Sequence, residues 1–355
     1  MKMDYGKVLK RAWEILWQYR VLWVFGVIVA LAAAGGGGPN FYTFDSGDFD
    51  EGYPFGPEGW TRSWELTEVV PQAAEVWAAV AGGILAIVLG LACLAVIIFV
   101  VKTIFLYVGE TALIRMVDDF EETGEKRGVR QGFRLGWSRT ALRLFVIDLL
   151  SKLPAMVILF LFFLLGVGVV ALMTVARDAV VLQGISIVAA IGLAFLVILL
   201  AIVIALAVSL VRPLIFRRCA VEGVGVIDSL KEGFAFIRRH ITDVVLTWLI
   251  MIGLQIGWGL ALIPVVLFLL FVGVVFGGGL GLLVGGLASL VAKGAVPWIL
   301  GTLVGLPIFI LVLAAPLTFL NGLAEVYKSS VWTLAYRELR ALEGVGTKSG
   351  STPAE

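Results

Sequence analysis

Apolar residues occur along this chain in long uninterrupted runs. A helix needs about 20 apolar residues to cross the hydrocarbon core of a bilayer. Six runs approach or exceed this length, and the longer ones indicate tilted helices or helices that extend beyond the bilayer. The pattern predicts an all-α integral membrane protein with six transmembrane helices. These are expected at residues 21–38, 74–101, 144–174, 184–211, 243–276 and 296–320.

Two features leave alternatives to this span count. The stretch VFGGGLGLLVGGLASL (275–290) could form an extra span, which would place the C-terminal cations outside the cell. We therefore interpret it as an extended or re-entrant part of the fifth hairpin. LAAAG (31–35) resembles a signal-peptide cleavage site, but the charged leader before it is about 20 residues long and amphipathic, which argues against cleavage.

The positions of the cations predict the orientation. Of the 27 Lys and Arg residues, 22 fall in the N-terminal segment, the 108–143 and 212–240 connections and the C-terminal tail. The opposite connections hold only Arg62, Arg177 and Lys293. Because cytoplasmic loops are enriched in Lys and Arg, both termini are expected in the cytoplasm.

A similar segment precedes three of the spans. The stretches 8–26, 129–147 and 229–247 each contain a small residue followed by an aromatic one, then mixed cationic and aromatic helix, then a span. This pattern predicts amphipathic interfacial helices, the first at 4–20, each leading into a hairpin of two spans, and an internal repeat. The alternative is that basic, aromatic flanks occur in any membrane protein.

Such helices are expected to engage anionic lipid of the cytoplasmic leaflet, since each cation near that surface contributes on the order of 1 kcal/mol. The lipid-interface candidates are Lys10, Arg11, Trp13, Trp17, Arg130, Phe133, Arg134, Trp137, Arg139, Phe234, Arg238 and Arg239.

Polar residues within spans are costly and are candidates for function. They are Lys102, Asp148 and Lys152, with Gln255, Asn321 and Glu325 as weaker candidates. Asp148 and Lys152 lie four residues apart and share a helix face, so they form either a local neutralising pair or part of a polar cavity.

Small residues recur every fourth position in two spans, at Ala78, Gly82, Ala86 and Gly90 and at Gly273, Gly277, Gly281, Gly285 and Ser289. This spacing lets helix backbones approach closely, within the bundle or between protomers, so a homo-oligomer or a membrane-protein partner is a candidate. A pore or lipid slot is the alternative. The external loop 39–72 is acidic and aromatic-rich, and it lacks the ligand order of an EF-hand calcium loop.

The composition is 60% hydrophobic and 15% charged, and the mean hydropathy is +1.03. Soluble domains have about 45–50% apolar and 25% charged residues, so the chain needs lipid as its solvent. Two cysteines and one histidine predict neither a disulfide framework nor a metal site. Nucleophile-elbow, phosphate-loop and zinc-protease motifs are absent, so no enzyme activity, cofactor or nucleic-acid partner is expected.

The segments GFRLGWSR and GFAFIRRH, with the tail SSVWTLAYRELRAL (329–342), resemble a group of uncharacterised bacterial membrane proteins. That group is related to the membrane domain of some glycerophosphodiester phosphodiesterases. The resemblance implies a polytopic helical fold in a bacterial cytoplasmic membrane. It carries no phosphodiesterase activity, because the catalytic domain is absent.

These observations predict one membrane domain (1–343) that ends in a cytoplasmic helix (323–343), followed by a disordered tail (344–355). The first functional hypothesis is a non-enzymatic membrane-organising or partner-binding subunit. The second is a permease or transporter of lipids or small amphiphiles, which would need a polar cavity. An intramembrane enzyme would need clustered acid and base residues, and none are apparent.

Overall fold

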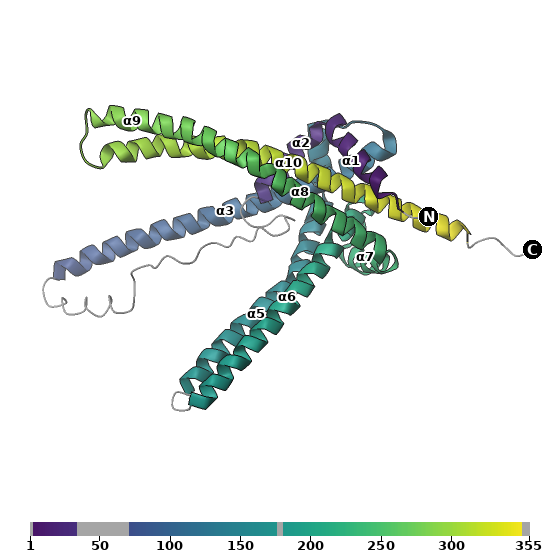
Figure 1. Cartoon of the computed structure of the whole chain (residues 1–355), viewed down its shortest axis with the longest axis horizontal. Coiled ribbons are helices and arrows are strands. Elements are labelled where there is room, and N and C mark those ends of the chain that lie inside the picture. Colours follow the sequence, from purple (N-terminus) through teal and green to yellow (C-terminus); the bar gives the residue numbers. More distant parts are fainter. Residues whose placement is uncertain (1–2, 34–70, 176–179, 350–355) are drawn as a thin grey trace, which may run out of the picture. The chain divides into compact units, whose positions relative to one another are not determined.

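A computed structural model describes residues 3–33, 71–175 and 180–349 of this chain (Figure 1). Of the residues that the structure describes, 92% are helical and none lies in a strand. Within residues 3–33, 71–175 and 180–349, five helical stretches are long and apolar enough to cross a membrane. The all-α membrane class predicted from the apolar runs is thus confirmed.

Only part of the first predicted span, residues 21–33, lies within the described residues. Helix α1 (Tyr5–Gln18) and helix α2 (Val21–Ala33) meet at a bend of 100°. Asp4 caps α1 by accepting a hydrogen bond from the Lys7 amide at 3.1 Å. The rest of span 21–38, with most of the acidic loop 39–72, lies outside the described residues.

The remaining elements comprise long helices at the predicted spans and short helices between them. They are α3 (Pro71–Thr123), α4 (Val129–Gly136), α5 (Arg139–Val175), α6 (Val180–Glu222), α7 (Val226–Arg239), α8 (Ile241–Gly273), the π-helical η2 (Val274–Gly278), α9 (Gly279–Ser289) and α10 (Val296–Ser349). The stretch 275–290 continues α8 as helix, which is the extended arrangement. The predicted C-terminal helix 323–343 belongs to α10, which also runs into the segment 344–355 where the sequence predicts a disordered tail.

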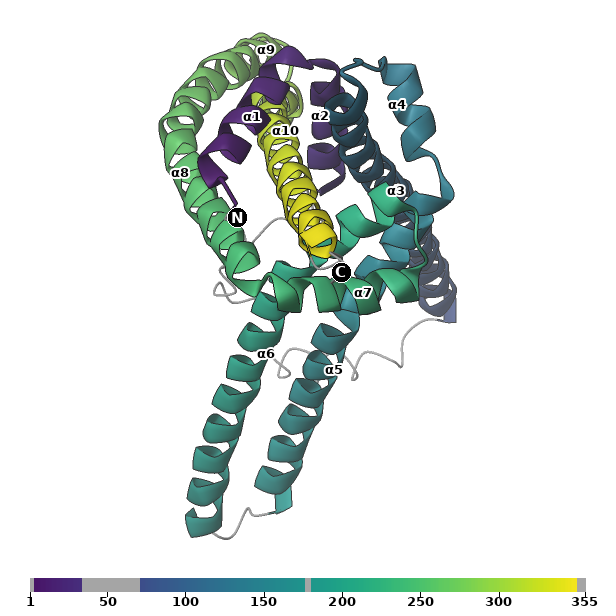
Figure 2. The ribbon, with the colours of Figure 1, turned by 90° about the vertical axis from the view of Figure 1, so that its right-hand side faces the viewer.

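The chain forms two compact units, Ala32–Phe105 and Met1–Leu31 with Leu106–Glu355. Within the smaller unit, the side chains of α3 from Leu85 to Val101 are exposed. Within the larger unit, α5 and α6 run side by side as a hairpin (Figure 2). Apolar side chains need no protein burial when lipid surrounds them, so this exposure suits spans.

The core of the larger unit surrounds the second half of α10. Almost every residue of α10 from Glu325 to Leu339 is buried or half-buried, including Val326, Trp332 and Tyr336. Buried residues of four other elements complete this core; they include Val8, Ala12 and Ile15 of α1, Leu22 and Phe25 of α2, Leu113 and Met116 of α3, and Leu214 and Phe216 of α6. The residues of this core therefore come mainly from the segments that are rich in Lys and Arg, namely the N-terminal segment, the two basic connections and the C-terminal part of α10.

The glycine ridge of η2 and α9 packs against α10. A Cβ on Gly277 would come within 2.8 Å of the Gly305 carbonyl oxygen, and one on Gly281 within 2.9 Å of the Gly301 carbonyl oxygen. The tight packing predicted for Gly273, Gly277, Gly281 and Gly285 is therefore present within the chain. In α3, by contrast, a Cβ on Gly82 or Gly90 would meet no described atom within 4 Å.

Candidate functional site

Six polar side chains from four helices of the larger unit form a cluster that we call the polar junction. It consists of Tyr107 and Glu110 on α3, Asp148 on α5, Arg212 and Arg217 on α6, and Glu325 on α10. All are buried except Arg212, which is half-buried. Burial of charge is costly unless it is paired, so this cluster is the first candidate for a functional site.

Asp148 is the best-connected member of the polar junction. Its carboxylate accepts a hydrogen bond from the Tyr107 hydroxyl at 2.5 Å and lies 2.6 Å from Arg212 Nη2. Lys152 Nζ lies 2.8 Å from the same carboxylate, as the four-residue spacing predicts. The Lys152 side chain is 52% exposed and that of Asp148 only 3%. Arg212, whose side chain is 16% exposed, is thus the inner counter-ion, and Lys152 is the outer one.

Glu110 and Arg217 are less well satisfied. Glu110 is 8% exposed and Arg217 5% exposed. Arg217 Nη1 donates to the Pro213 carbonyl oxygen at 2.8 Å, but Arg217 Nε and Glu110 Oε2 have no hydrogen-bond partner among the described residues. The charges of Arg212 and then Arg217 act on Glu110, together with those of Asp148 and Glu325. Unsatisfied buried charges are rare in native proteins, which marks this pair for attention.

The other predicted intramembrane residues have different surroundings. Lys102 is half-buried in the smaller unit, Gln255 is half-buried on α8, and Asn321 is exposed on α10. The sequence missed Tyr107, Glu110, Arg212 and Arg217. The available signal was that Glu110 interrupts the mostly apolar residues between Lys102 and Arg115, and that Arg212 directly follows the apolar run of α6.

The three short helices bury one face against the chain itself. The small residue of each predicted pair is buried, and these are Ala12, Gly132 and Gly233. A Cβ on Gly233 would lie 2.9 Å from the Ile215 side chain, and Tyr327 of α10 contacts α1 through the Leu9 carbonyl oxygen at 3.4 Å. The apolar faces of these helices are therefore occupied by protein, which differs from a helix that floats on lipid alone.

Most lipid-interface candidates lie on the opposite, exposed side, which we call the basic aromatic surface. It comprises Lys10, Trp13, Trp17, Arg130, Arg134, Trp137, Arg139, Phe234, Arg238 and Arg239. Several candidates also have partners within the chain: the Trp13 ring lies 6.0 Å from the Tyr327 ring, and Arg239 Nη1 lies 3.5 Å from Glu343 Oε1. Arg11 pairs with Glu121 at 2.8 Å and with Glu14 at 3.2 Å, and the half-buried Phe133 ring lies 5.7 Å from the ring of Phe25.

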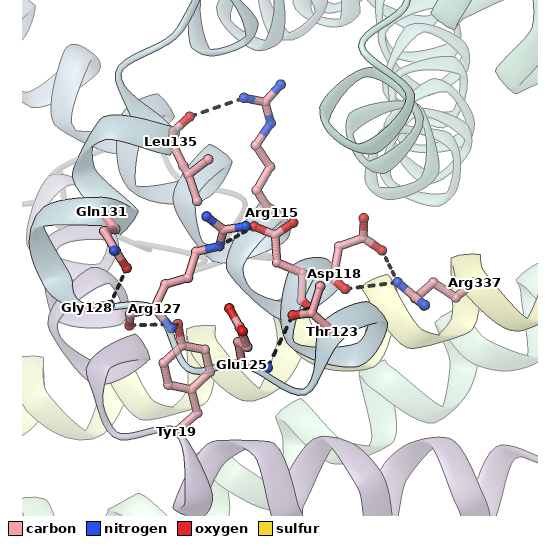
Figure 3. Close-up of polar contacts among 11 residues, drawn as sticks. Tyr19, Arg115, Asp118, Thr123, Glu125, Arg127, Gly128, Gln131, Leu135 and Arg337 are labelled. Carbon is pink, nitrogen blue, oxygen red and sulfur yellow. Dashed lines mark hydrogen bonds and ion pairs between the residues drawn. The ribbon is translucent and has the colours of Figure 1, made fainter.

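The connection between α3 and α4 is held by polar contacts (Figure 3). The Tyr19 hydroxyl donates to the Arg127 carbonyl oxygen at 2.9 Å and accepts from the Arg127 amide at 2.7 Å. Gln131 Oε1 accepts from the Gly128 amide at 3.1 Å, and Arg115 Nη1 donates to the Leu135 carbonyl oxygen at 3.3 Å. These contacts fix α4, and with it the direction in which its arginines point.

We expect Tyr5→Phe to weaken the attachment of α1 to α8. The Tyr5 hydroxyl donates to Asp243 Oδ1 at 2.7 Å, and its loss should cost about 1 kcal/mol. Burial, then this hydrogen bond and the Asp243 charge, raise the pKa of Tyr5 to about 12. Free tyrosine has a pKa of about 10, so the contribution is complete below pH 10 and is lost as the pH rises toward 12.

Thermal unfolding of both proteins across this pH range measures the effect. The difference in melting temperature between wild type and Tyr5→Phe should shrink as the pH rises from 10 to 12. A constant difference would show that the hydroxyl contributes nothing through its protonated form.

Comparison with known proteins places the chain in a family. The family of unknown function (DUF7544) matches residues 7–332. No curated protein and no solved structure matches the chain. None of these comparisons links it to glycerophosphodiester phosphodiesterases, so that resemblance stays an expectation. Among the described residues, no group of three or more His, Cys, Asp or Glu side chains could hold a metal ion.

Proposed function

We propose that this chain, which belongs to the DUF7544 family of unknown function, is a non-enzymatic membrane-organising or partner-binding subunit that grips anionic lipid through its basic aromatic surface. The observation that carries the proposal is the exposure of large rings on helices whose other face is already buried. Trp137, for example, is 65% exposed although Gly132 and Gly136 of the same segment are buried.

An exposed ring needs a surrounding medium that accepts it. Full burial of a large apolar side chain contributes about 1.5–3 kcal/mol, so rings that face water forgo this stabilisation. Tryptophan and phenylalanine beside arginine suit the headgroup region, where the rings reach apolar depth and the cations meet anionic lipid. The packing of the short helices on the core holds this surface in place.

The same features support a finer architecture. Ala12, Gly132 and Gly233 are each buried and each followed by an aromatic residue, which supports a threefold repeat of interfacial helix and hairpin. With span 21–38 included, this gives six spans. The distribution of Lys and Arg supports cytoplasmic termini in a bacterial cytoplasmic membrane.

Replacement of Arg130, Arg134 and Arg139 by glutamine tests the proposal. At about 1 kcal/mol per cation, the three changes should weaken the preference for anionic lipid by up to about 3 kcal/mol at low salt. The measurement is the association of spin-labelled phosphatidylglycerol, relative to phosphatidylcholine, with the full chain reconstituted in mixed bilayers. Added salt should reduce the wild-type preference more than that of the variant.

The matched control replaces the same three residues by lysine, which keeps the charge. It should retain the preference for phosphatidylglycerol. An unchanged preference in the glutamine variant would remove the lipid-surface role of α4 and its junction with α5.

The polar junction favours a second candidate function, a permease or a transporter of small amphiphiles. Buried ionisable residues on four converging helices are typical of polar pathways in membranes. Against this candidate, the glycine ridge closes η2 and α9 onto α10 without polar side chains. Uptake of a labelled small amphiphile into vesicles that hold the chain, compared with vesicles that hold the Asp148→Asn variant, would separate the two functions.

A further inference from the structure

We propose that the polar junction is a hydrated binding site, in which Glu110 Oε2, Arg212 Nε and Arg217 Nε hold ordered water. All three atoms are buried and lack a hydrogen-bond partner among the described residues. They come from two helices, and the charges of their groups act on one another. This site is separate from the basic aromatic surface, so it can fail while the lipid proposal stands.

The groups do not satisfy each other directly. Arg217 Nη1 donates to the backbone of its own helix, and Arg212 pairs with Asp148 through Nη2. A buried polar group that has no hydrogen-bond partner costs about 1–3 kcal/mol of stability, and more when the group is charged. Three such atoms at one junction therefore need partners from outside the chain.

The unpartnered donors and acceptor of the site indicate which kind of molecule can bind there. Two unpartnered donors and one unpartnered acceptor match a molecule that both donates and accepts hydrogen bonds, as water does. A buried water typically makes about three hydrogen bonds, so one or more waters can partner these positions. An anion would meet the carboxylates of Glu110 and Asp148, and a cation would meet both guanidinium groups. The site thus favours water, or a small neutral molecule of the same hydrogen-bonding kind, over ions.

Cysteine accessibility tests the hydration. In a chain with Cys93→Ser and Cys219→Ala, Glu110→Cys is compared with Leu113→Cys, which is buried on the same helix among apolar residues. A thiol in dry apolar surroundings has a raised pKa, and one unit lowers the thiolate fraction about tenfold. A water-soluble methanethiosulfonate should therefore modify Glu110→Cys about tenfold faster in bilayer nanodiscs. Equal slow rates would overturn the proposal.

A measurement on the unmodified chain guards against a variant that fails to fold. Hydroxyl radicals formed from bound water label nearby side chains. Tyr107 lies in the polar junction, whereas Tyr19 is a buried tyrosine at the α1–α2 bend. Faster radiolytic labelling of Tyr107 than of Tyr19 supports a hydrated junction. Labelling of Tyr107 at or below the rate of Tyr19 contradicts it.

Discussion

Replacement of Asp148 by asparagine is expected to destabilise the protein by about 3–5 kcal/mol. The change keeps the size of the side chain but removes the charge that faces Arg212 at 2.6 Å. A buried ion that loses its partner keeps its desolvation cost without compensation. Chemical unfolding of the purified chain in detergent, followed by circular dichroism, measures the loss.

Two matched variants make this expectation specific. Lys152→Met removes the outer, largely exposed cation of the same carboxylate and should cost less than about 1 kcal/mol. The double variant Asp148→Asn with Arg212→Met removes both buried charges and should recover much of the stability. Equal effects of Asp148→Asn and Lys152→Met would show that the carboxylate is not held by Arg212.

Gly277→Leu and Gly82→Leu should have opposite effects. A Cβ on Gly277 would lie 2.7 Å from Phe309 Cβ and 2.8 Å from the Gly305 carbonyl oxygen, so leucine must push α10 away. Overpacking of this kind costs about 1–3 kcal/mol or more. Gly82 meets no described atom within 4 Å, and leucine has the higher helix propensity there by about 1 kcal/mol.

The midpoint of thermal unfolding in bilayer nanodiscs distinguishes the two positions. Gly277→Leu should lower it, and Gly82→Leu should leave it unchanged or raise it. A large loss at Gly82 would indicate that the ridge of α3 is covered by a partner in the membrane, such as a second copy of the chain.

The helical class could be predicted because a long apolar segment in lipid can satisfy its backbone hydrogen bonds by itself only as an α-helix. The places of α1, α4 and α7 also followed from small and aromatic residues at helical spacing. The burial of α10 could not be predicted in the same way, because its central segment is rich in Ser and Thr. Ser330 and Thr333 donate to carbonyl oxygens of their own helix at 2.8 Å, and this satisfies their buried hydroxyl donors.

The candidate site was harder to predict than the fold. A pairing of Asp148 with Lys152 was one of two interpretations of their spacing on one helix, and Lys152 Nζ lies 2.8 Å from the Asp148 carboxylate. Arg212 was counted with the cytoplasmic cations, since local sequence does not show that α6 brings it to Asp148 on α5. Contacts of this kind depend on which helices pack against each other. The sequence pattern of one helix does not show which other helix it contacts.

The continuity of α10 has a mechanical consequence. Its 54 residues form one helix of about 81 Å, which exceeds the roughly 30 Å hydrocarbon thickness of a bilayer. The part around Gly301 and Gly305 packs closely against α9. Further along the helix, Tyr336 binds Glu222 of α6 and Arg337 binds Asp118 of α3. Pro307 and Pro316 lie within this helix, and each removes one backbone hydrogen bond. Bending of the lipid-embedded portion is therefore expected to concentrate at these two points before it reaches the segment that binds α3 and α6.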